Sequence, residues 1–232
     1  GLKDAFIEGY ADSSPHELGY EGEGLGGKEK DRGYIEVITE FDRAKTYYFG
    51  TAKKTLKNKS AEGADYFATP DPLGLKMVEW AGVKPGDSVL EPSAGHGAIA
   101  RWFPETVNRF HVVEPSYELG SRLAMVVPDA KLYKHGFEDL DIGNKYDAIV
   151  MNPPFGRGGS TAVKHLAKAF KHLRDGGRMV VLLPEGPAAD KKFDKWYNSD
   201  DADNGYIIAD VNLPPVTFER AATRVKTRVL VI

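Results

Sequence analysis

Two apolar runs in this chain each end in a segment rich in glycine or proline. Val89–Leu90 leads into Glu91–Gly97 (EPSAGHG), and Ala148–Met151 leads into Asn152–Phe155 (NPPF). Short apolar runs bounded in this way are typical of buried parallel strands. Because ligands of open α/β sheets bind beyond the carboxyl ends of the strands, we expect both segments to face one crevice.

Strand-like and helix-like segments alternate from residue 71 onward. Helices are expected from Asp71 to the stop at Gly82, from about Ala98, over 118–126 and over 161–173. Strands are expected at 89–90, 110–113, 131–133, 148–151, 178–183, 206–211 and 227–232. Such alternation indicates a doubly wound sheet. We therefore predict an α/β, Rossmann-like fold with a mostly parallel seven-stranded sheet.

The chain divides by composition into two parts. Residues 1–65 are predicted to form a partly mobile N-terminal extension, crowded with Gly, Ser and charge over 9–33 and helical within 34–57. Residues 66–232 are predicted to form the α/β domain. The chain starts with Gly1 rather than Met, so we expect a processed product or a piece of a longer protein. No apolar run is long enough to span a bilayer, and we expect a cytoplasmic protein.

Composition excludes several kinds of chemistry. The chain has no cysteine, which rules out disulfides, thiolate metal sites and a cysteine nucleophile. The six histidines show no metal-ligand spacing, so no metal is expected. The net charge of −3 gives no overall attraction to nucleic acid. A polyanionic partner would have to be held by local basic patches.

The glycine-rich segment and a later carboxylate predict a ligand that contains a nucleoside. Gly95 and Gly97 follow the first strand, where a backbone without Cβ atoms can approach a ligand. Glu114 ends the second strand, where a carboxylate can accept hydrogen bonds from both hydroxyls of a ribose. Two alternatives stay open. The first is a tight turn without a ligand, and the second is a helix-capping role for Glu114, since Pro115 and Ser116 also indicate a helix start.

Asn152–Phe155 predicts a site for a planar amino group. Two prolines remove backbone donors and stiffen the chain, which leaves carbonyl groups and the Asn152 side chain as acceptors. Two acceptors can pull a delocalised amine toward tetrahedral geometry and expose its lone pair to an activated methyl group. Phe155 can stack on the ring that carries the amine, a contact worth about 1–3 kcal/mol per base. The alternative is a proline-rich loop with a packed Phe.

On these motifs the chain resembles the N6-adenine-specific DNA methyltransferases that use S-adenosylmethionine, in the class whose cofactor motif precedes Asn-Pro-Pro. The resemblance covers 66–232. It implies that Ala68, Thr69 and Pro70 hold the methionine part of the cofactor, that Glu91, Ser93, Gly95 and Gly97 form the cofactor loop, and that Glu114 binds the ribose. It also implies that Asn152, Pro153, Pro154 and Phe155 are the catalytic segment.

The later motifs follow the family less closely. The segment 213–218 and the strand after it are similar to the final motif of the family, and Phe218 is expected to cover the other face of the base. Phe137 is expected to line the pocket of the cofactor adenine with Glu138, although Asp139 stays an alternative acid. Nothing follows the last strand in place of the family's recognition domain. We therefore expect an additional specificity domain or subunit.

Basic residues are expected to flank the mouth of the site. They cluster over 157–178 and again at Arg220, Arg224, Lys226 and Arg228, where nucleic-acid phosphates would lie. Arg157 and Arg224 are the candidate substrate contacts. The lysines of the first cluster also fit the solvated face of an amphipathic helix, so that alternative stays open.

The resemblance implies a transfer of the methyl group of S-adenosylmethionine to N6 of an adenine flipped out of DNA, in a cytoplasmic protein of bacterial or phage type. Cytosine C5 methylation is excluded because that reaction needs a cysteine. Two alternatives remain. The same transfer could act on a planar nitrogen of RNA or of a protein glutamine, or the chain could be a catalytically silent partner subunit that binds cofactor or nucleic acid.

Overall fold

The computed structural model describes residues 68–232 except 142, 144, 204, 215–216 and 219–225. The predicted N-terminal extension, its helix and the domain boundary lie outside the described residues. Arg220 and Arg224, from the predicted second basic cluster, lie outside them too.

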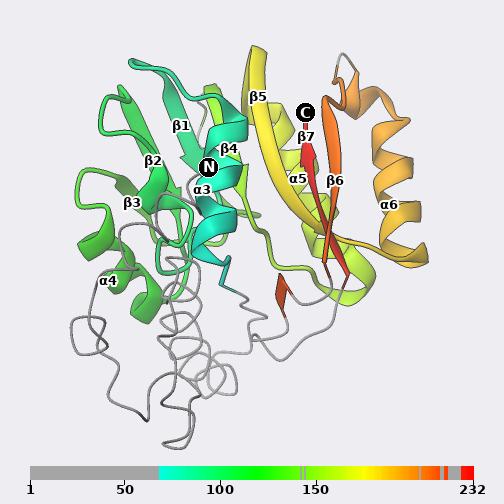
Figure 1. Ribbon diagram of the computed structural model, residues 1–232, viewed down its shortest axis with the longest axis horizontal. Helices are drawn as coiled ribbons and strands as arrows, with labels where there is room; N and C mark the ends of the chain where they lie inside the picture. The colour runs from blue at the N-terminus through cyan, green and yellow to red at the C-terminus, as the bar shows by residue number, and fades with distance from the viewer. Residues whose placement is uncertain (1–67, 142, 144, 204, 215–216, 219–225) are drawn as a thin grey trace, which may run out of the picture. The chain divides into compact units, whose positions relative to one another are not determined.

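Seven strands form one sheet in the order β3-β2-β1-β4-β5-β7-β6 (Figure 1). The strands from β1 to β5 pair in parallel, whereas β7 pairs antiparallel with β5 and β6. This sheet confirms the predicted mostly parallel α/β fold. The bounds are β1 (Ser88–Glu91), β2 (Arg109–Val113), β3 (Lys131–Tyr133), β4 (Tyr146–Met151), β5 (Leu173–Pro184), β6 (Ala209–Leu213) and β7 (Thr227–Val231).

The strand order reverses between β1 and β4. The chain proceeds from β1 outward to β2 and β3, then returns to β4 on the other side of β1 and proceeds outward to β5. At such a reversal the connections leave the two central strands in opposite directions, and a ligand can bind between them. The segments that follow β1 and β4 are the two that the sequence singles out.

Helices pack on both faces of the sheet. They are α3 (Asp71–Ala81), α4 (Tyr117–Val126), α5 (Ser160–His172) and α6 (Pro187–Tyr197), with the 3₁₀ turns η2 (Ala100–Trp102), η3 (Arg157–Gly159) and η4 (Asp200–Ala202). In Figure 1, α3 lies in front of β4 and β5, whereas α5 lies behind β5 and packs against α6. Between these layers the core includes Ala148–Met151 and Met179–Leu183, all at most 2% exposed.

The structure corrects several predicted boundaries. The helix expected from Ala98 is only η2, because Phe103 is extended and precedes Pro104, which disfavours further helix. The strand β5 begins at Leu173 rather than 178, and Gly176, with φ +72°, lies where the pairing with β4 is irregular. The strand β6 begins at Ala209 rather than 206. The helix α6 was not predicted.

Candidate active site

The two predicted ligand-facing segments leave neighbouring strands of the sheet. Val89 pairs with Ala148 and Leu90 with Ile149, so β1 and β4 end side by side. The segments that begin at Glu91 and Asn152 therefore emerge next to each other at the carboxyl edge of the sheet. This placement is the one that the apolar runs predicted.

Glu114 holds the glycine-rich turn through its carboxylate. Its Oε2 accepts a hydrogen bond from the backbone N–H of Gly95 over 2.8 Å, and its Oε1 accepts one from the backbone N–H of Ser116 over 2.8 Å. The side chain is buried. The carboxylate therefore holds the glycine-rich turn and the start of the next helix together.

Gly97 is required by the packing of the turn against the next helix. It has φ +92°, and a Cβ there would lie 3.1 Å from the side chains of both Leu123 and Val126. Both residues belong to α4. The predicted reason for this glycine was approach to a ligand, but contact with α4 already demands it.

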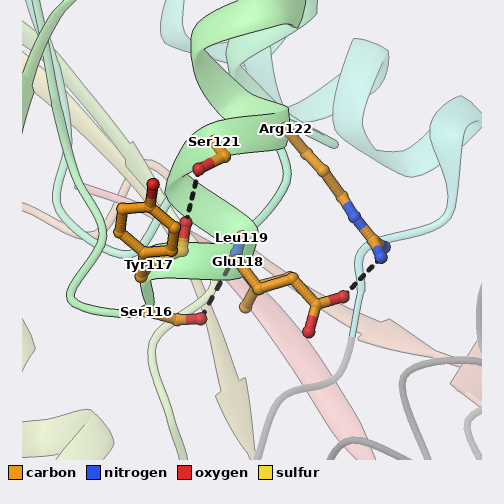
Figure 2. A network of polar contacts seen from close by, with 6 residues as sticks. All are labelled: Ser116, Tyr117, Glu118, Leu119, Ser121 and Arg122. Carbon is orange, nitrogen blue, oxygen red and sulfur yellow. Dashed lines mark hydrogen bonds and ion pairs between the residues drawn. The ribbon is translucent and has the colours of Figure 1, made fainter.

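The first turn of α4 is fixed beside Glu114 by local hydrogen bonds (Figure 2). Ser116 is the N-cap, and its Oγ accepts from the N–H of Leu119 over 3.3 Å. Further along, the Ser121 hydroxyl donates to the carbonyl of Tyr117 over 2.8 Å, and Arg122 pairs with Glu118. Ser116 therefore caps α4 through its side chain, and the Glu114 carboxylate accepts the hydrogen bond of the Ser116 backbone N–H.

Glu91 is a buried acid at the end of β1 with an unsatisfied oxygen. It is 1% exposed, and its Oε2 has no hydrogen-bond partner among the described residues. Burial raises the pKa of Glu91 well above its usual value, and the nearby charge of Glu114 raises it further, whereas a backbone hydrogen bond with Ala100 lowers it. A buried acceptor without a partner beside a second carboxylate fits a ligand that carries positive charge.

His96 stays neutral inside the same turn. It is 8% exposed, and burial lowers its pKa to about 4, helped by the charges of Arg101 and Arg122. An imidazole with this pKa adds no positive charge to the turn near neutral pH.

Asn152 meets the segment before α3. Its Nδ2 donates a hydrogen bond to Oγ1 of Thr69 over 3.1 Å, although the two residues are 83 positions apart. Thr69 and Ala68 are buried, and Pro70 is the N-cap of α3. The fold thus brings together the predicted cofactor segment 68–70 and the predicted catalytic segment. The contact fixes the position of the Asn152 side chain beside Thr69.

The rest of the catalytic segment packs on the core. Phe155 is 8% exposed and Phe218 is 1% exposed, and both belong to one apolar cluster. A base can stack on Phe218 only if that side chain becomes accessible, so this role stays a prediction. Gly156 follows with φ +65°, and Arg157 is exposed at the start of η3.

A buried histidine connects two predicted cofactor residues. The Nδ1 of His165 lies 3.4 Å from Oγ of Ser93, and its Nε2 lies 2.7 Å from Oε1 of Glu138. The second contact has ion-pair distance, although the ring N–H is not well aligned with the oxygen, since Nε2 lacks a well-formed hydrogen bond. Phe137 is buried and packs edge-on against the same imidazole, with ring centroids 5.5 Å apart.

His165 was not among the predicted site residues. By helical spacing, the large apolar residues Val163, Leu166 and Phe170 would form the buried face of this helix, but the buried residues of α5 are Ala162, His165, Leu166 and Ala169. These four residues follow the i, i+3, i+4, i+7 spacing of one helix face, and His165 is the polar member of that face. This spacing could have identified His165 from the sequence.

Several of the predicted phosphate-binding side chains contact the protein itself. Lys168 donates to the carbonyl of Glu138 over 2.7 Å, and Lys171 lies 3.0 Å from Asp201. Arg174 pairs with Asp147 at 2.6 Å, and Arg178 donates to the carbonyl of Trp80 over 3.2 Å. Arg228 pairs with Asp210 at 3.1 Å and with Asp190 at 3.6 Å. These contacts engage part of the donors of each side chain, and the expectation that they bind phosphates stays a prediction.

Neither a metal cluster nor a membrane-spanning helix occurs in the described part of the chain. It contains no group of three or more acidic or His side chains placed to hold a metal ion. Within the same residues, no helix combines the length and the apolar character needed to cross a membrane.

The known proteins that this chain resembles include methyltransferases. Residues 121–200 match the family model of the methyltransferase small domain. The tRNA (guanine(10)-N2)-dimethyltransferase of Methanothermobacter thermautotrophicus strain Delta H is 28% identical over 128 residues, which are 48% of this chain and 37% of that protein. The comparisons support a methyltransferase. The matched domain and this relative imply S-adenosylmethionine as the cofactor.

Solved structures share the fold. A protein assigned as the modification subunit of a type I restriction enzyme from Vibrio vulnificus YJ016 has a TM-score of 0.60 at 17% identity, over 88% of this chain and 51% of that one. A protein assigned as an RNA methyltransferase from Pyrococcus horikoshii has a TM-score of 0.56 at 16% identity, over 72% and 87%. The chain thus spans about half the length of the modification subunit, and less of the tRNA enzyme.

Proposed function

We propose that the chain transfers the methyl group of S-adenosylmethionine to the exocyclic N6 of adenine in DNA. The observation that carries the proposal is the hydrogen bond between Asn152 and Thr69. It joins the segment proposed for amine binding to the segment proposed for cofactor binding. A methyl donor and an amine acceptor that bind at these two segments would therefore lie next to each other.

The residues around the glycine-rich turn fit this cofactor. The unsatisfied Oε2 of Glu91 suits a positively charged molecule, and Glu114, buried next to the glycine-rich turn, is proposed to bind the ribose. Ala68, Thr69, Pro70, Ser93, Gly95 and Gly97 complete the proposed binding segments, and Phe137 and Glu138 are proposed for the adenine end. When bound, the cofactor supplies a methyl group activated by its sulfonium centre.

Asn152 and Pro153 act on the amine. The Asn152 side-chain oxygen and the Pro153 main-chain carbonyl accept its two hydrogens, which localises the nitrogen lone pair. Pro154 keeps the backbone stiff, so the acceptors need no rearrangement during the reaction. The residues contribute mainly by positioning and by excluding water, and no covalent intermediate with the protein forms.

The substrate base has to leave its helix to reach Asn152. Flipping costs a few kcal/mol and is offset by stacking on Phe155, with Phe218 proposed for the opposite face. Arg157, which is exposed next to the catalytic segment, is proposed to contact a phosphate, as is Arg224. Because several other basic side chains are engaged within the protein, a further domain or subunit is proposed to supply sequence specificity.

A second candidate function is the same transfer to a guanine or adenine of RNA. The tRNA enzyme from Methanothermobacter favours it, since its name specifies an exocyclic guanine nitrogen. Both reactions use a planar amine and the same acceptors, so Asn152–Phe155 serves either one.

Labelled S-adenosylmethionine separates the candidates. The protein is offered double-stranded DNA, single-stranded DNA, tRNA and a protein extract in parallel, and the products are digested and identified. The proposal expects label in N6-methyldeoxyadenosine. Label only in methylated guanosine or adenosine from tRNA overturns the DNA assignment. Label in protein glutamine, or in no acceptor while the cofactor still binds, overturns nucleic-acid methylation by this chain.

A further inference from the structure

We propose that His165 is a positioning residue that fixes Ser93 as a hydrogen-bond acceptor for the cofactor. The inference rests on the proposed function, because it concerns the same cofactor site. Ser93, Glu138 and His165 come from the turn after β1, the loop after β3 and the helix α5. One imidazole thus joins three segments of the fold.

The imidazole of His165 is protected from water, whereas the Glu138 side chain is half exposed. His165 is 4% exposed, so water competes little for either ring nitrogen. Phe137, which is 2% exposed, packs edge-on against the imidazole, with 5.5 Å between the ring centroids. Lys168 lies 5.2 Å from the Phe137 ring and donates to the carbonyl of Glu138. This lysine therefore ties the backbone of Glu138 to α5 independently of the histidine.

Glu138 selects the tautomer of the imidazole. A carboxylate at 2.7 Å from Nε2 favours a proton on that nitrogen, and in a neutral imidazole Nδ1 is then an acceptor. Partial burial by itself would raise the pKa of Glu138, but its contact with His165, a backbone hydrogen bond and the charge of Lys168 lower it. The ionised carboxylate is the form that sets the tautomer.

The tautomer then orients the Ser93 hydroxyl. With Nδ1 as an acceptor at 3.4 Å, the Ser93 proton points to the imidazole. The hydroxyl then offers its remaining lone pairs to a ligand, and no proton. A hydroxyl held as an acceptor favours a ligand group that donates, such as the ammonium of the amino-acid part of the cofactor.

Nuclear magnetic resonance tests the tautomer directly. The nitrogen shifts of His165 are measured at pH 8 in protein labelled with ¹⁵N-histidine and assigned with the His165→Phe variant. The proposal expects a proton on Nε2 and none on Nδ1, with a shift change at Nδ1 in Ser93→Ala. A proton on Nδ1 overturns the proposal, and this readout does not need the cofactor to bind.

Binding tests the consequence. The probes are S-adenosylhomocysteine, which has the amino-acid part, and 5′-methylthioadenosine, which lacks it. His165→Phe is expected to weaken binding of the first about threefold to tenfold, as expected for one hydrogen bond, and to leave the second unchanged. His165→Asn, which keeps a polar group near the position of Nδ1, should restore part of the loss. Ser93→Ala should give the same selective loss, and the double variant should add little to it.

His172→Phe is the matched control. His172 lies on the same helix and packs on the same Phe137 ring, at 6.1 Å between ring centroids, so this variant tests a general effect on packing. Equal loss of both probes in His165→Phe and His172→Phe overturns the positioning role, as does unchanged binding in His165→Phe. Failure of the unaltered protein to bind either probe would count against the proposed function instead, and the tautomer measurement would still decide the role of His165.

Discussion

The Asn152 amide donates its hydrogen bond to the Thr69 hydroxyl over 3.1 Å. Thr69 immediately precedes Pro70, the N-cap of α3, and Asn152 follows β4, so the contact spans two elements of the fold. The Thr69 hydroxyl holds one end of the amide in place, so the opposite end is the one that faces away from Thr69.

Thr69→Val should therefore slow methyl transfer. The variant loses the acceptor for Asn152, and one hydrogen bond is worth about 0.5–1.5 kcal/mol, which corresponds to about a twofold to tenfold lower kcat at saturating cofactor. Thr69→Ser keeps the hydroxyl and serves as the control, with a rate near that of the unaltered protein. Equal rates in Thr69→Val and Thr69→Ser would show that this contact does not orient the amide.

Glu91→Gln should stabilise the protein at high pH and weaken cofactor binding. The pKa of Glu91 in the folded protein is raised above the ordinary 4.5, so its stabilising contribution is present below that pH and is lost as the pH rises toward the raised value. Glutamine removes this dependence. Melting temperatures of both proteins between pH 5 and 8 measure it, and the difference in favour of Glu91→Gln should grow with pH. A constant difference would contradict the buried, protonated state.

The histidines His96 and His111 should make the fold sensitive to acid. Burial is the main cause that lowers the pKa of each to about 4, from an ordinary 6.5. The unfolded chain therefore takes up protons below pH 6.5 that the folded protein does not, and stability should fall steadily as the pH drops from 6.5 to about 4. Urea unfolding at stepped pH measures this slope. A flat profile over that range would contradict the neutral, buried state of both rings.

Tyr146→Phe should destabilise the core without touching the proposed site. The Tyr146 hydroxyl lies 2.7 Å from Nδ1 of His111, and both side chains are buried. Losing a partner of a buried polar atom costs about 1–3 kcal/mol. Tyr133→Phe is the control, because the Tyr133 ring also packs on His111, at 5.3 Å between centroids. Its expected cost in urea unfolding is smaller, and equal costs would argue against the hydrogen bond.

Gly156→Ala should be more damaging than Gly176→Ala. Both glycines have positive φ, +65° and +72°, but a Cβ at Gly156 would lie 2.1 Å from Oγ1 of Thr161, whereas a Cβ at Gly176 meets nothing within 4 Å. Conformational strain alone costs about 1–2 kcal/mol, which is the expectation for Gly176→Ala. Gly156→Ala should exceed it in unfolding measurements and also reduce transfer, since Gly156 follows Phe155. Similar losses in the two variants would contradict the steric account.

The strands beside the site could be predicted because each is a buried apolar run. Val89–Leu90 and Ala148–Met151 are fully buried, and a run of this kind carries its own signal in the sequence. The antiparallel direction of β7 could not be obtained from such runs, since direction depends on the path of the chain. The prediction of a helix from Ala98 was wrong because Pro104 disfavours helical conformation at the residue before it, Phe103, so that only a 3₁₀ turn forms.

The site could be predicted one segment at a time, but its contacts could not. Glycines, prolines and acids at strand ends identified Gly95, Glu114 and Asn152. The hydrogen bonds from Gly95 to Glu114 and from Asn152 to Thr69 join residues far apart in the chain, so they depend on the order of the strands. His165 was missed because a histidine within an amphipathic helix looks like part of its polar face.

Asn152→Ala gives the most direct test of the central claim, that this amide activates the acceptor amine and does not bind the cofactor. Binding of S-adenosylhomocysteine and single-turnover transfer from labelled S-adenosylmethionine are measured on the same preparations of the variant and the unaltered protein. Binding should stay within about twofold, whereas the rate should fall by about 100-fold or more, as expected when a transition-state hydrogen bond is lost. An Asn152→Ala protein that transfers methyl groups at the original rate would contradict the account.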